Sequence, residues 1–158
     1  MKTEELKEQY PWANNSQLQE IMWGLESKLN ITYYTKPEFN EDQMWQIRLG
    51  LEKGLNVNIY NNPEFSWKQM RQIRLGLEGG IDIYIYAKPE YSWEQMQEIR
   101  CGLGKGVDVS IYAKPEYDSL QMRQIRYGLE DGVDVSQYAN PELSWEEMRE
   151  IRFKLINN

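Results

Sequence analysis

The sequence predicts an all-α fold, an α-solenoid of six 26-residue repeats that each contain a helix, a turn and a short helix. Three observations lead to this prediction. Proline recurs every 26 residues, a helix-capping residue follows each proline at a fixed distance, and apolar residues recur at helical spacing. The prolines are Pro11, Pro37, Pro63, Pro89, Pro115 and Pro141. Each repeat is numbered below from its proline, which is frame position 1.

No insertion or deletion interrupts this frame, so we expect one repeat domain over residues 1–158. Residues 1–10 would form an N-terminal cap. The expected repeats are 11–36, 37–62, 63–88, 89–114, 115–140 and a truncated C-terminal repeat, 141–158. In such an array each repeat contacts mainly its neighbours.

Frame position 4 predicts the start of a long helix, because its side chain can accept a hydrogen bond from a free first-turn N–H group. The residues there are Asn14, Asn40, Ser66, Ser92, Asp118 and Ser144. Position 7 completes a capping box with Gln17, Gln43, Gln69, Gln95, Gln121 and Glu147. Position 18 holds Gly54, Gly80, Gly106 and Gly132, as expected just beyond a helix C-terminus. We therefore expect a helix over frame positions 5–17.

The buried face of this helix is expected at positions 8, 11 and 15, which are Met or Leu, always Ile and always Leu. We interpret the methionines as core residues rather than soft-metal ligands. Glycine at position 14 disfavours a helix, so a neighbouring segment must need the space there. We expect that neighbour to be the short helix or the next repeat. The glycines are Gly24, Gly50, Gly76, Gly102 and Gly128.

Frame positions 19–24 are ambiguous. Their apolar residues alternate as in a strand, which leaves a βα solenoid with a short parallel strand as the alternative fold. Position 20, however, is always Asn or Asp, which favours a helix start. A strand would also point Gln137 into the core beside Val135. We therefore choose a short helix that leaves Gln137 outside and directs the tyrosine at position 24 inward.

Composition argues against several classes of function. The net charge of −7 disfavours direct nucleic-acid binding. The chain has no histidine, and Cys101 stands where other repeats have packing residues, so we expect no enzyme, cofactor or metal site. No apolar run has the length of a signal peptide or a membrane span, and a single cysteine demands no oxidising compartment. We expect a cytoplasmic protein that does not bind membranes.

Arginine recurs at position 12 and glutamate at position 2, and both are absent from the first repeat, which has Met22 and Trp12 there. This coincidence favours structural ion pairs within one repeat. A ladder of arginines that grips phosphates or bases is the alternative, and the acidic balance argues against it. The predicted pairs are Arg48, Arg74, Arg100, Arg126 and Arg152 with Glu38, Glu64, Glu90, Glu116 and Glu142.

Positions 5, 9, 13 and 16 fall on a second helical stripe beside the constant one, and we call its residues that vary between repeats, at positions 5, 9 and 13, the variable strip. Its Trp, Tyr and Arg residues are the types that dominate protein-binding hot spots. The predicted partner-binding residues are Trp45, Arg71, Gln97, Arg123, Arg149, Trp67, Trp93 and Trp145. A seam between repeats is the alternative role of these tryptophans. A second functional hypothesis is an acidic inhibitor, in which glutamates such as Glu26, Glu52, Glu78 and Glu130 occupy the basic groove of a nucleic-acid-binding or host-defence protein.

The motif Q-M-x-x-I-R-x-G-L-x-x-G-V-D-V-S-x-Y-A-x-P describes Gln95–Pro115 and Gln121–Pro141. It resembles tandem repeats of bacterial, phage and mobile-element proteins, a family without an assigned activity. The resemblance covers residues 11–158 and implies a repeat fold with no catalytic residue. The first repeat departs most from the motif and is expected to act as a cap.

Modular stacking predicts that one whole repeat can be removed. Deleting 89–114 joins Lys88 to Pro115 and recreates a native Lys–Pro junction. The shortened protein should stay helical and cooperative, with somewhat lower stability, because stability is roughly a sum of repeat and interface terms. Deleting only 102–114 should instead leave Met96 and Ile99 of the long helix without cover. Circular dichroism melts measure both; loss of cooperativity in the first variant would contradict independent modules.

Overall fold

The computed structural model describes residues 2–158 and confirms the all-α prediction, since these residues are helical or irregular and contain no strand. The chain divides into two compact units, with the boundary in the sequence between Glu78 and Gly79, and each is described by itself. The first unit contains α1 (Thr3–Gln9), α2 (Asn15–Glu26), α3 (Glu41–Glu52) and α4 (Trp67–Glu78). Short 3₁₀ helices follow α2 and α3, namely η1 (Ile31–Tyr33) and η2 (Val57–Ile59).

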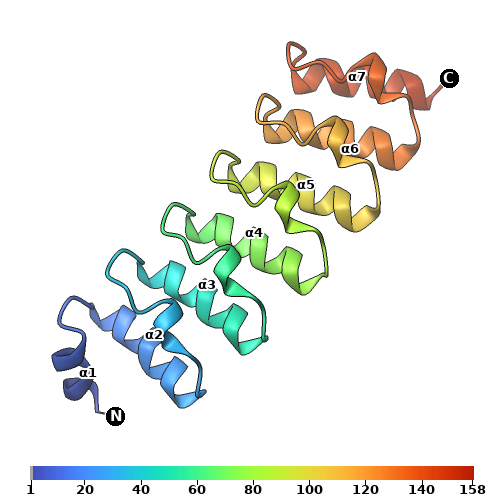
Figure 1. Cartoon of the computed structure of the whole chain (residues 1–158). Helices are drawn as coiled ribbons and strands as arrows, with labels where there is room; N and C mark the ends of the chain where they lie inside the picture. Colours follow the sequence, from blue (N-terminus) through green and yellow to red (C-terminus); the bar gives the residue numbers. More distant parts are fainter. Residues whose placement is uncertain (1) are drawn as a thin grey trace. The chain divides into compact units, whose positions relative to one another are not determined.

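The second unit begins with the 3₁₀ helix η3 (Ile83–Ile85) and continues with α5 (Trp93–Lys105), α6 (Ser119–Asp131) and α7 (Trp145–Ile156). The 3₁₀ helices η4 (Val109–Ile111) and η5 (Val135–Gln137) follow α5 and α6. Within each unit the long helices pack side by side in chain order (Figure 1). None of the helices described has both the length and the apolar character needed to cross a membrane.

The predicted helix starts are confirmed, and the helices end at position 16 or 17, within one residue of the prediction. Six long helices begin one residue after the predicted N-cap, and in each case the side chain at frame position 4 accepts from the backbone N–H at position 7. The position-7 side chain in turn accepts from the N–H at position 4, which completes the capping box. The glycines at position 18 all have a positive φ, and Lys28 adopts a similar φ of 56° in the first repeat.

The core lies beneath positions 8 and 11, where residues such as Met96 and Ile99 are fully buried. The leucines at position 15 are only half-buried, so the predicted stripe is wrong at this edge. The buried face is centred on positions 7, 8, 11 and 14, and position 15 lies at its margin. An apolar residue at position 3, which the sequence interpretation overlooked, adds to the core. Examples are Phe39, Phe65, Tyr91 and Tyr117.

The ambiguous segment at positions 19–24 is a short helix, as predicted, and its geometry is 3₁₀. In each case the Asn or Asp at position 20 accepts from the backbone N–H two residues later. Gln137 is exposed and the tyrosine at position 24 is buried, again as predicted. Each of these 3₁₀ helices contains only three residues. Three residues are too few for a helical pattern of apolar residues to identify the helix from sequence.

The tyrosine at position 24 explains the glycine at position 14. In the second unit the Tyr112 hydroxyl donates to the backbone carbonyl of Glu98 at 2.8 Å, directly beside Gly102. A Cβ at Gly102 would lie 2.0 Å from the Tyr112 hydroxyl and 2.8 Å from Val109. The close neighbour is therefore the short helix of the same repeat. Burial raises the pKa of Tyr112, so the phenol stays protonated and can donate.

A glutamine at position 7 connects neighbouring repeats. The Gln95 amide nitrogen donates to the carbonyl of Tyr117 at 2.6 Å and to that of Pro115 at 3.2 Å, while its oxygen accepts in the capping box. The carboxamide therefore uses both its donors and its acceptor. Gln121 binds Leu143 and Pro141 in the same way. In the first unit, Gln17 donates to Phe39 and Gln43 to Phe65 and Pro63.

Two glycines of α5 provide a matched test of the tyrosine contact. Gly102→Ala should lower the free energy of unfolding by about 2 kcal/mol or more, because the added methyl group overlaps Tyr112 and Val109. Gly104→Ala should raise it by about 0.5–1 kcal/mol, since Gly104 is exposed, helical and has its nearest neighbour at 3.8 Å. Urea denaturation measures both. Equal effects of the two substitutions would contradict the close packing of the short helix.

Candidate protein-binding surface

Four arginines at position 12 form structural contacts with partners other than the predicted glutamates at position 2, so those four predicted pairs are wrong. They are Arg48, Arg74, Arg126 and Arg152. Arg48 contacts Glu20 of the preceding repeat through Nε at 2.6 Å and also pairs with Glu52 on its own helix. Arg74 uses Gln46 and Glu78 in the same manner. The glutamates at position 2 lie exposed in the turn before each helix and form none of these pairs. They are Glu38, Glu64, Glu90, Glu116 and Glu142.

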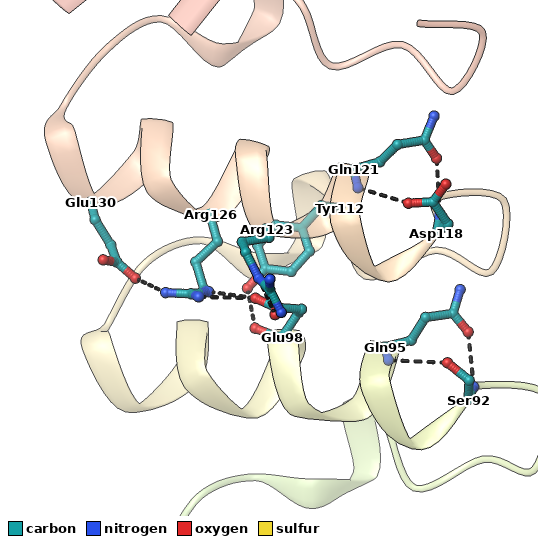
Figure 2. A network of polar contacts seen from close by, with 9 residues as sticks. All are labelled: Ser92, Gln95, Glu98, Tyr112, Asp118, Gln121, Arg123, Arg126 and Glu130. Carbon is teal, nitrogen blue, oxygen red and sulfur yellow. Dashed lines mark hydrogen bonds and ion pairs between the residues drawn. The ribbon is translucent and has the colours of Figure 1, made fainter. Parts of the chain in front are cut away.

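Glu98 joins two helices of the second unit through its carboxylate. Figure 2 shows that two arginines of α6 converge on this carboxylate of α5. Arg123 donates to one carboxylate oxygen at 2.8 Å, and Arg126 donates to the other at 2.9 Å. Arg126 also pairs with Glu130 on its own helix at 2.5 Å. The carboxylates raise the pKa of Arg126 although burial opposes this, so its charge is stabilised inside the helix interface.

The recurrent acceptor at position 10 is the functional partner that the sequence interpretation missed. Position 10 is Glu or Gln in all repeats, and the arginine that reaches it lies 28 residues later, in the next repeat. This also explains Met22. The element before α2 is the short helix α1, and Met22 instead lies with Leu6 and Leu18 around a small cavity between α1 and α2. The constant Glu or Gln at position 10 was the available signal.

In the first unit the structure brings two residues of the variable strip together. Trp23 of α2 and Trp45 of α3 are 43% and 40% exposed, and both line a cavity between these helices. The Arg48 guanidinium lies 5.2 Å from the centre of the Trp23 ring, so this tryptophan also covers the ion pair beneath it. Arg71 is exposed on α4, whereas Trp67 is half-buried. Exposure therefore supports a binding role for Trp45 and Arg71 more than for Trp67.

In the second unit the strip is divided between exposed and structural residues. Arg149 is exposed and lies 5.0 Å from the centre of the half-buried Trp145 ring, one turn away on α7. Arg123 keeps 40% of its side chain exposed although it contacts Glu98. Gln97 and Trp93 are half-buried.

Position 13 carries further aromatic surface that we did not include among the predicted binding residues. Tyr127 and Phe153 are 36% and 48% exposed. Two arginines lie close to the Tyr127 ring, with Arg126 at 4.7 Å and Arg152 at 5.3 Å from its centre. The aromatic ring thus contacts these guanidinium groups and keeps part of its surface exposed.

Substitutions around Glu98 should show whether the fold requires the negative charge at this position or only a hydrogen-bond acceptor. Arg126→Met should lower the free energy of unfolding by about 2–3 kcal/mol, because it leaves a buried carboxylate with Arg123 alone. Glu98→Gln should change the free energy of unfolding by about 1 kcal/mol or less, since Gln46 at the same frame position accepts a hydrogen bond from Arg74. Chemical denaturation of both variants checks this. A larger loss for Glu98→Gln would mean that the charge itself is required.

Protein-family models, curated proteins and solved structures were compared with the chain, and none of the three comparisons found a match. The function therefore has to be argued from the surface of these repeats.

Proposed function

We propose that the protein is a non-enzymatic repeat scaffold that binds a protein partner along the variable strip. The observation that carries this proposal is the contrast between two stripes of the same helices. Positions 8 and 11 are nearly constant and form the core, whereas positions 9 and 13 change between repeats and place Trp23, Trp45, Tyr127 and Phe153 at the surface. The stability of the fold explains the constant residues at positions 8 and 11, but it does not explain exposed aromatic residues at positions 9 and 13.

The chemistry of the strip supports this function. Large aromatic residues and arginine bury much surface on binding and keep a polar group for orientation, which is why they dominate interface energetics. Two strip arginines are also held in place: Arg149 lies over Trp145, and Arg123 is anchored by Glu98. Side chains that are ordered before binding lose less entropy when a partner arrives.

The acidic-inhibitor hypothesis receives less support. Glu52, Glu78 and Glu130 are each paired with the position-12 arginine of their own helix, so internal cations already compensate part of the acidic surface. A groove-blocking inhibitor would require these carboxylates to face its partner. If the acidic surface were the binding element, affinity would fall steeply between low and moderate salt.

We further propose that the protein acts in the cytoplasm and belongs to the repeat family that its motif resembles, which links it to bacteria, phages and mobile elements. The single cysteine and the absence of any need for a disulfide are compatible with a reducing compartment. Phage or mobile-element origin stays a prediction from the motif.

A pull-down from native-host lysate with mass spectrometry tests the proposal. The strip variant should recover its partner about tenfold less than the unmodified chain, because hot-spot side chains are lost. The control changes three exposed turn glutamates and should retain the partner. Circular dichroism confirms that both variants fold. The strip variant is Trp45→Ala, Arg71→Ala and Arg123→Ala; the control is Glu38→Ala, Glu64→Ala and Glu116→Ala. Equal recovery by both variants would remove the strip from consideration.

A further inference from the structure

A cavity of about 220 Å³ lies between α2 and α3 in the first unit. Its walls include two half-exposed tryptophans and three carboxylates. They are Trp23, Trp45, Glu20, Glu41 and Asp42. The volume is below the ~300–1,000 Å³ of pockets for drug-sized ligands, so the cavity suits a single side chain better than a whole small molecule.

The electrostatics of the cavity favour a cation. Glu20 is buried and its carboxylate contacts one guanidinium, that of Arg48. Burial raises the pKa of Glu20, and the nearby charges of Glu52 and Asp42 act in the same direction, although Arg48 opposes them. A further positive charge beside Glu20 would stabilise the ionised carboxylate. The Arg48 guanidinium already lies over the Trp23 ring, and the indole face of Trp45 can attract a further cation.

The second unit shows which cation fits. At the equivalent place between α5 and α6, Glu98 binds two guanidinium groups, one on each carboxylate oxygen. Arg126 corresponds to Arg48, and both stand at frame position 12. The other guanidinium belongs to Arg123 at frame position 9, where the second repeat has Trp45.

Because position 9 is Trp45 here and not arginine, the second repeat has no counterpart of Arg123 to contact Glu20. With tryptophan at position 9, the chain supplies one arginine to Glu20 where it supplies two to Glu98. The tryptophan adds an aromatic wall in place of the missing charge. Planar stacking on an aromatic face and forked hydrogen bonding to a carboxylate are the two contacts that distinguish arginine from lysine.

We infer that the cavity between α2 and α3 binds an arginine side chain of the protein partner. The guanidinium would donate to Glu20 and lie against Trp45, with Glu41 and Asp42 contributing negative potential at the entrance. This inference rests on the proposed function, because it assigns a partner chemistry to one part of the variable strip.

Nuclear magnetic resonance of the tryptophan indole N–H groups tests it on the full chain. The probes are N-acetyl-L-arginine amide and N-acetyl-L-citrulline amide, which have similar shape and differ in charge. The arginine probe should shift the indole signals of Trp23 and Trp45 with a dissociation constant of about 1–10 mM, as expected for one side chain. The citrulline probe should bind at least about tenfold more weakly. Equal shifts from both probes, or no shift from arginine, would overturn the inference.

Two variants copy residues that the chain uses elsewhere and should therefore fold. Trp45→Arg supplies the guanidinium internally, as Arg123 does, and should abolish probe binding while the melting temperature stays equal or rises. Glu20→Gln keeps an acceptor for Arg48, as Gln46 does for Arg74, and should weaken probe binding at least about fivefold. Undiminished binding by Trp45→Arg would contradict the inference.

The pull-down distinguishes this inference from the proposed function. If the arginine probe fails to bind but the strip variant still loses its partner, the strip binds protein and the cavity assignment is wrong. If the probe binds and the strip variant keeps its partner, the cavity is a guanidinium site outside the partner interface, which overturns the inference as stated.

Discussion

The carboxamide of the position-7 glutamine is the interaction on which the repeat architecture depends. Its oxygen fixes the start of one long helix, and its nitrogen holds the backbone of the next repeat, as Gln95 does with Tyr117. A buried carbonyl without a donor would destabilise the junction by about 1–3 kcal/mol. One side chain thus contributes both to the start of a long helix and to the stacking of the next repeat.

Two further contacts complete each repeat around this junction. The position-24 tyrosine attaches the short helix to the long helix, and only a glycine allows it to approach so closely. The position-12 arginine then crosses to the acceptor of the preceding repeat. Because these contacts use nearly constant residues on the buried side, the opposite stripe is free to vary. The proposed binding surface is a consequence of this division.

Helix positions were predictable from sequence because each boundary depends on residues within one turn of each other, such as Ser92 and Gln95. The 3₁₀ helices were harder to predict, since three residues give no helical period. The ion pairs were assigned wrongly because Glu98 and Arg126 lie in different repeats, and the comparison of whole repeats favoured partners within one repeat. Partial burial of the tryptophans depends on neighbouring helices, so no pattern in one helix could predict it.

The glutamine contact also gives the array a direction. Each junction needs an N–H donor from one repeat and carbonyl acceptors from the next, so the two faces of a repeat are not interchangeable. Glu147 stands at position 7 of α7 and caps its helix as well as a glutamine does, accepting at 2.9 Å. A carboxylate, unlike a carboxamide, has no N–H to donate, however. One replacement of nitrogen by oxygen therefore preserves the helix cap and removes the donor that the other repeats use to hold the next backbone.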